Sequence, residues 1–101
     1  MVAELNTHPL GVGTSVSRYT SKAIQALSSI EGLRIQITPM STVMEAENID
    51  LILEGVRRVH QALIESGVQR ISTILVIDDR RDKLRRMEDM VSSVSKAMEN
   101  I

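Results

Sequence analysis

Residues 33–45, LRIQITPMSTVME, decide the fold because they hold two short extended segments separated by one turn. Apolar and polar side chains alternate before the Pro39-Met40 pair, and extended character resumes over residues 41–46. Segments joined by so short a turn pair as an antiparallel hairpin. A loop longer by one residue would turn every side chain of the second strand to the other face. The predicted register pairs Ile37 with Thr42, Ile35 with Met44 and Arg34 with Glu45.

The segments on either side of this hairpin predict one strand and one helix each. Residues 2–8 alternate loosely and residues 70–78 are rich in β-branched side chains, as strands are. Apolar side chains at steps of three and four predict a helix from Val16 to near Gly32 and another over residues 49–63 that is stopped by Gly67. The order βαββαβ predicts an α+β, ferredoxin-like fold, in which two helices cover one face of an antiparallel sheet. We expect residues 1–101 to form a single domain.

A third, C-terminal helix is predicted by apolar residues that recur at strictly alternating steps of three and four. Such a narrow apolar seam is typical of helices that pack against another helix. The last predicted strand also places Ile74 and Val76 on the sheet face that the first two helices leave open. We therefore expect an oligomer, a tetramer as the first choice and a dimer as the second, with the seam buried in the same or a neighbouring subunit. The seam consists of Leu84, Met87, Val91, Val94, Met98 and Ile101.

The composition excludes several classes of function. Without cysteine the chain has neither disulfides nor thiolate chemistry, and two histidines are too few for a typical structural zinc site. One tyrosine and no phenylalanine or tryptophan argue against a base-stacking surface for nucleic acid, as does a net charge of −1. The chain has no long apolar run and no signal-like segment, so we expect a cytoplasmic protein without membrane contact, metal or cofactor.

The stretch HPLGVGTSVSRY, residues 8–19, links the first strand to the first helix through two glycines. Glycines before a helix can bind a phosphate through backbone N–H groups, but this stretch matches neither the dinucleotide-binding motif nor the P-loop motif. A turn with positive φ followed by a Ser15 or Ser17 cap explains the stretch more simply. Arg18 beside the glycines partly resembles acylphosphatases, which share this topology, and leaves a phosphate-binding enzyme as the alternative function.

Four stretches resemble, in their order and spacing, the small thiamine-binding protein family: AELNTHPLGVGTSVSRY, PMSTVMEAE, VRRVHQAL and ISTILVIDDRRD. The resemblance spans nearly the whole chain. It implies a ferredoxin-like subunit with a C-terminal helix, assembled into a homotetramer. It also implies binding of thiamine or its hydroxymethylpyrimidine moiety without catalysis, so no catalytic residue is expected.

With the predicted register, polar side chains would gather on the open sheet face near the Gly11–Ser15 loop. A carboxylate there can pair with the ring nitrogen and the amino group of an aminopyrimidine, while loop hydroxyl and N–H groups take its hydroxyl or phosphate end. Glu45 is the expected principal recognition group. The predicted ligand-binding residues are Asn6, His8, Gly13, Thr14, Ser15, Gln36, Met40, Thr42 and Glu45.

Three of the polar features also have a purely structural interpretation. Glu45 can form a cross-strand ion pair with Arg34. His60 lies on the apolar stripe of its helix, where a hydrogen-bonded core histidine is more common than a ligand group. The carboxylates of Asp78 and Asp79 suit a hard cation, but a solvated charged segment before the third helix is the preferred interpretation.

Overall fold

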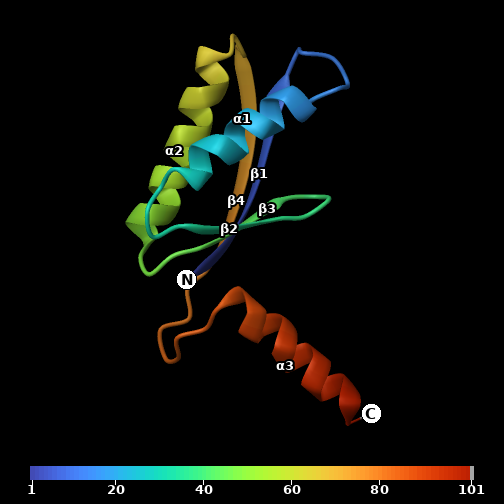
Figure 1. Ribbon diagram of the computed structural model, residues 1–101, viewed down its shortest axis with the longest axis vertical. Helices are drawn as coiled ribbons and strands as arrows, with labels where there is room; N and C mark the ends of the chain where they lie inside the picture. The colour runs from blue at the N-terminus through green and yellow to red at the C-terminus, as the bar shows by residue number, and fades with distance from the viewer. Residues whose placement is uncertain (101) are drawn as a thin grey trace.

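The computed structural model describes residues 1–100 and contains the predicted order of elements (Figure 1). Ile101, the last predicted residue of the seam, lies outside the described residues. The α+β, ferredoxin-like arrangement with an additional C-terminal helix is therefore confirmed. The elements are β1 (Val2–Leu10), α1 (Ser17–Ser28), β2 (Arg34–Ile37), β3 (Thr42–Glu45), α2 (Ile49–Glu65), β4 (Arg70–Asp78) and α3 (Met87–Glu99).

The four strands form one antiparallel sheet in the order β2-β3-β1-β4. β1 is central, and it pairs with β3 only from Val2 to Leu5 but with β4 along its whole length. The predicted hairpin register is confirmed, since Arg34 lies opposite Glu45, Ile35 opposite Met44 and Ile37 opposite Thr42. Side chains therefore divide between the two faces of this hairpin as the sequence predicts.

The ends of several elements differ from the predicted ones. β1 continues to Leu10 rather than ending at His8, because Pro9 lies beyond the last β3 partner, where a missing N–H leaves the ladder to β4 intact. α1 ends at Ser28, short of Gly32. The hydroxyl of Ser28 donates to the carbonyl oxygen of Ile24, and such bonds compete with the backbone bonds that would continue the helix.

The helices α1 and α2 cover one face of the sheet, and the hydrophobic core lies between them and the strands (Figure 1). Gly55 lets α2 approach closely, since a Cβ atom built there would lie 3.0 Å from Leu27 and 3.1 Å from Leu33. The core is therefore tightly packed where α2 meets α1 and the segment just before β2. Its fully buried large side chains are Leu27, Met44, Ile52, Val59 and Leu63.

The helix α3 extends away from the two-layer body (Figure 1). Of its predicted seam only Met87 is buried, whereas Val91 is 67%, Val94 60% and Met98 65% exposed. Burial of the seam within the chain, one of the two predicted arrangements, is thus not found beyond the first turn of α3. As predicted, Ile74 and Val76 lie on the helix-free face and are exposed. Among the described residues, no helix has both the length and the hydropathy needed to cross a membrane.

Candidate functional site

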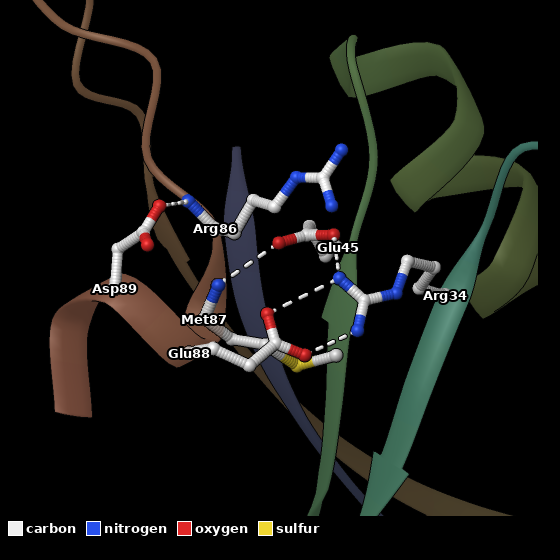
Figure 2. Close-up of polar contacts among 6 residues, drawn as sticks. All are labelled: Arg34, Glu45, Arg86, Met87, Glu88 and Asp89. Atoms are coloured by element: carbon white, nitrogen blue, oxygen red, sulfur yellow. Dashed lines mark hydrogen bonds and ion pairs between the residues drawn. The ribbon is translucent and has the colours of Figure 1, made fainter. Parts of the chain in front are cut away.

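The carboxylate of Glu45, at the end of β3, connects the sheet to the first turn of α3 (Figure 2). Arg34, its cross-strand neighbour, donates to Oε2 at 2.6 Å, and the backbone N–H of Met87 donates to Oε1 at 2.9 Å. Arg34 also forms an ion pair with Glu88 of α3. The Glu45 side chain is only 12% exposed. Both of its oxygens are therefore engaged, and the predicted ion pair between Glu45 and Arg34 is confirmed.

The ionisation of this cluster follows from its hydrogen bonds. The bond from Arg34 holds the pKa of Glu88 below its ordinary value. The same two carboxylates, Glu88 first and then Glu45, raise the pKa of Arg34 further above its ordinary value. A carboxyl whose pKa is lowered by folding stabilises the fold above its unfolded pKa and stops doing so as the pH falls through the folded value. The contact between α3 and the sheet is thus complete at neutral pH and weakens in acid.

A cleft of about 320 Å³ lies beside this cluster, between the end of the hairpin and residues 84–86. Its walls carry the carboxylates of Glu45 and Glu47 and the guanidinium groups of Arg34, Arg85 and Arg86. Charges of both signs line it, together with the apolar residues Met1, Leu33, Ala46 and Leu84. The cleft is large enough for a small ligand, but its best-placed carboxylate is already occupied.

A smaller hollow of about 50 Å³ lies on the other face of the sheet, beneath α1. Leu5 of β1, Leu27 of α1 and Leu63 of α2 contribute apolar side chains to its lining. The Oγ1 atom of Thr7 is buried there, and it has no hydrogen-bond partner within residues 1–100. Buried hydroxyls are nearly always hydrogen-bonded, so the hydroxyl of Thr7 is an exception, and a bound ligand could supply the hydrogen bond that it lacks. The other polar side chains that line the hollow are Tyr19, Thr20 and Thr42.

Behind the hollow, His60 of α2 contacts the sheet through a side-chain hydrogen bond. Its Nε2 atom lies 2.6 Å from Oγ1 of Thr73, which is the cross-strand neighbour of Thr7. His60 is half-buried and hydrogen-bonded, which confirms the interpretation of it as a satisfied core histidine. The Thr73 hydroxyl is hydrogen-bonded through this contact, whereas the Thr7 hydroxyl faces the hollow without a hydrogen-bond partner within residues 1–100.

The structure does not bring the predicted ligand-binding residues together. Glu45 pairs with Val2, at the beginning of β1, whereas the Gly11–Ser15 loop follows the end of β1 at Leu10. Nine residues of strand separate the two places by roughly 30 Å. The expected gathering of Glu45 near the loop is therefore wrong, although the register that suggested it is right. The same open face carries Asn6, His8 and Gln36.

The remaining predicted residues lie at the opposite end of the sheet from Glu45 or on its other face. Thr42 shares the helix-covered face with Leu5 and lines the hollow. Met40 is at the tip of the hairpin and is 84% exposed. Gly13 has a φ of 89°, as the predicted turn requires. Gly13, Thr14 and Ser15 belong to the loop that joins β1 to α1, the two elements between which the hollow lies.

The loop does not end in the predicted serine cap. Val16 occupies the N-cap position of α1, and no side chain accepts a hydrogen bond from the first turn. Neither Ser15 nor Ser17 therefore fixes this end of the helix. A helix whose first turn lacks a side-chain cap is held less firmly there than a capped one.

The charged segment after β4 forms ion pairs with itself. Arg80 bonds Asp82 at 2.8 Å, and Arg81 bonds Asp79 at 2.9 Å. These pairs agree with the preferred interpretation of a solvated charged segment. Residues 1–100 contain no cluster of three or more side chains suited to holding a metal ion.

Sequence reasoning missed Thr7, Tyr19 and Thr20 as candidate ligand contacts. A signal for Thr7 was present, because the alternation of β1 puts it on the same face as the apolar Ala3 and Leu5. A hydroxyl side chain among apolar residues on the core face of a strand is unusual, and it indicates that this position makes a polar contact. Tyr19 and Thr20 carry no such signal, since their approach to the hollow depends on how α1 crosses the sheet.

Comparison with known proteins gives one family. The family described as thiamine-binding protein matches residues 3–95. A UPF0045 protein of Methanothermobacter thermautotrophicus is 42% identical over 95 residues, which are 93% of this chain and 95% of that protein.

Solved structures of similar fold agree. The crystal structure of the hypothetical protein MJ1052 of Methanocaldococcus jannaschii superposes with a TM-score of 0.84 at 34% identity, covering 93% of this chain and 94% of that one. A Thermotoga maritima protein described as a candidate for thiamine biosynthesis or salvage has a TM-score of 0.75 at 22% identity, covering 92% of this chain and 96% of that one. The latter likeness concerns the fold alone.

Proposed function

Because the chain belongs to the thiamine-binding protein family, we propose that it binds thiamine, or the hydroxymethylpyrimidine part of thiamine, without transforming it. The observation that supports a location for the binding site is the buried hydroxyl of Thr7 in the hollow beneath α1, which has no hydrogen-bond partner within residues 1–100. An aminopyrimidine offers ring nitrogens and an amino group to such a hydroxyl, and an apolar face to the leucine side chains that line the hollow.

The hollow widens to admit the ring. A cavity of about 150 Å³ holds benzene, so a hollow of about 50 Å³ is too small for an aminopyrimidine as it stands. The wall that moves is the first two turns of α1, which contribute Tyr19, Thr20 and Ala23 and lack a side-chain cap. The buried Leu27 holds the other end of α1 in the core. The glycine loop follows this movement and supplies polar groups to the outer end of the ligand.

We extend the proposal to a homotetramer. A closed tetramer of identical subunits built on two-fold axes needs two different self-complementary interfaces. The chain offers two separate exposed apolar surfaces. One is the open sheet face around Ile74 and Val76, and the other is the stripe of Val91, Val94 and Met98 on α3.

Calorimetric titration with thiamine and with hydroxymethylpyrimidine tests the binding site. We expect Thr7→Val and Thr42→Val each to weaken binding about 2- to 12-fold, the equivalent of one neutral hydrogen bond of about 0.5–1.5 kcal/mol. Ser95→Ala, on exposed α3, is the control and leaves the affinity unchanged.

Glu45→Gln separates the two candidate sites in the same titrations. If the ligand lies beneath α1, this variant binds as the unaltered protein does. A large loss with Glu45→Gln and none with Thr7→Val would move the site to the cleft beside α3. Absence of binding by either compound, together with acyl phosphate hydrolysis that depends on Arg18, would replace the binding function by the enzyme alternative.

A further inference from the structure

Tyr19 carries the single aromatic ring of the chain, since the sequence has no phenylalanine or tryptophan. It lies in the first turn of α1, lines the hollow and packs against the hydrophobic core. Its side chain is half-buried, and its neighbours Arg18 and Thr20 are exposed. Leu27 and Leu63, which also line the hollow, are buried. Tyr19 therefore stands at the mouth of the hollow, between its apolar interior and the solvent.

The ring of Tyr19 already holds a cation. The Cζ atom of Arg18 lies over this ring, 5.2 Å from its centroid. Within about 6 Å a guanidinium group is attracted by the electrons of an aromatic face, and the attraction is weak where the pair is exposed. Arg18 is exposed and forms no ion pair within residues 1–100. No carboxylate therefore holds the guanidinium in place, and another cation can displace it from the ring.

The lining of the hollow contains no charged residue. Thiamine, in contrast, carries a fixed positive charge on its thiazolium ring, which one methylene group joins to the aminopyrimidine. A charge brought to an apolar site needs a favourable interaction there. Among the side chains that line the hollow, Tyr19 alone offers an aromatic face, and such a face attracts cations.

We propose that Tyr19 recognises the positive charge of thiamine, and that the thiazolium ring takes the place of the Arg18 guanidinium on the tyrosine ring. The proposal rests on the function proposed above and divides its site into two parts. The inner part, at Thr7, receives the pyrimidine, and the mouth, at Tyr19, receives the thiazolium ring. Hydroxymethylpyrimidine is uncharged and uses the inner part alone. The contact with Tyr19 thus makes the site select the whole vitamin over its pyrimidine fragment.

The first test compares thiamine with deazathiamine, in which an uncharged thiophene ring replaces the thiazolium ring. We expect Tyr19→Leu to weaken thiamine binding about 2- to 30-fold more than deazathiamine binding in calorimetric titrations. Tyr19→Phe keeps the aromatic face and restores the ratio of the two affinities. Because the two ligands have the same shape, any strain that Tyr19→Leu causes in α1 affects both and cancels in this ratio.

The second test removes the competing cation. We expect Arg18→Gln to raise the affinity for thiamine about 2- to 5-fold relative to that for deazathiamine, because no guanidinium then has to leave the ring. Lys22→Gln is the matched control, since it removes a positive charge from the same helix. Lys22 lines the outer groove between α1 and α2, where salt screens its charge from the hollow, and its replacement leaves the ratio unchanged.

The third test uses the ring itself as the reporter. Without tryptophan, the tyrosine emission of the protein comes from Tyr19 alone. An electron-poor cationic ring stacked on a tyrosine quenches its emission. We therefore expect thiamine to quench the emission, with the same dissociation constant as calorimetry gives, and hydroxymethylpyrimidine to change it less.

The outcomes that overturn the proposal differ from those that overturn the binding function. Equal losses of both ligands in Tyr19→Leu mean that the ring only packs against the ligand. A lower affinity for thiamine in Arg18→Gln means that the guanidinium holds the ligand rather than leaving the ring. Unchanged emission at saturating thiamine places the thiazolium ring away from Tyr19. In each of these cases the pyrimidine still binds, whereas absence of heat with every compound removes the proposed function itself.

Discussion

We expect Ala23→Leu to lose at least about 100-fold in affinity for thiamine, equivalent to about 2.7 kcal/mol of binding free energy. Ala23 lines the hollow beneath α1, on the part of the helix that faces the sheet. A leucine there fills the space into which the pyrimidine ring would enter. Calorimetric titration measures the loss, and thermal unfolding of the same sample shows whether the larger side chain has also strained the core.

Ala26→Leu is the matched control, because it makes the same change on the same helix. Ala26 lines an open groove between α1 and α2 on the outer surface, away from the sheet. Its replacement leaves the affinity for thiamine unchanged. Binding by Ala23→Leu that equals that of the unaltered protein would show that no ligand enters the hollow.

Ile52→Ala should cost about 2–5 kcal/mol of the free energy of unfolding. Ile52 has no exposed surface and lies in α2 among the core residues that meet the sheet. The loss combines the removed apolar surface with the cavity that the tightly packed neighbours leave unfilled. Urea unfolding followed by circular dichroism measures it.

Ile64→Ala on the same helix controls for the change in side-chain type. Ile64 is 61% exposed, so its replacement should alter the free energy of unfolding by less than about 0.5 kcal/mol. Similar losses for the two variants would mean that the body is packed differently from the description given above.

The hairpin shows what local sequence can predict. Its register followed from two alternating segments and a short turn, because both depend on residues that are neighbours in the chain. The side-chain faces of β4 followed in the same way from its alternation. The helix ends were harder to predict from the sequence. The hydroxyl of Ser28 forms a hydrogen bond that competes with the helical backbone bonds, and no side chain caps α1 at Val16, although two serines lie nearby.

The candidate site was harder to predict than the fold. Which residues share a face was predicted correctly for Glu45, Gln36 and Asn6. Their position along the strand was not, because it depends on the pairing of β3 with β1 across a long connection. The hollow beneath α1 depends on where and at what angle this helix crosses the sheet, and the periodicity of the sequence does not predict either of them.

The attachment of α3 has a consequence for the order of events during folding. Every buried core residue except Met87 precedes the end of β4, so the sheet and its two covering helices can close before α3 has a surface to meet. The side chains of Arg34 and Glu45 can then bind the first turn of α3, which follows them in the chain. In the proposed tetramer, subunits can therefore fold before they associate, which separates the search for the native core from encounters between unfinished chains.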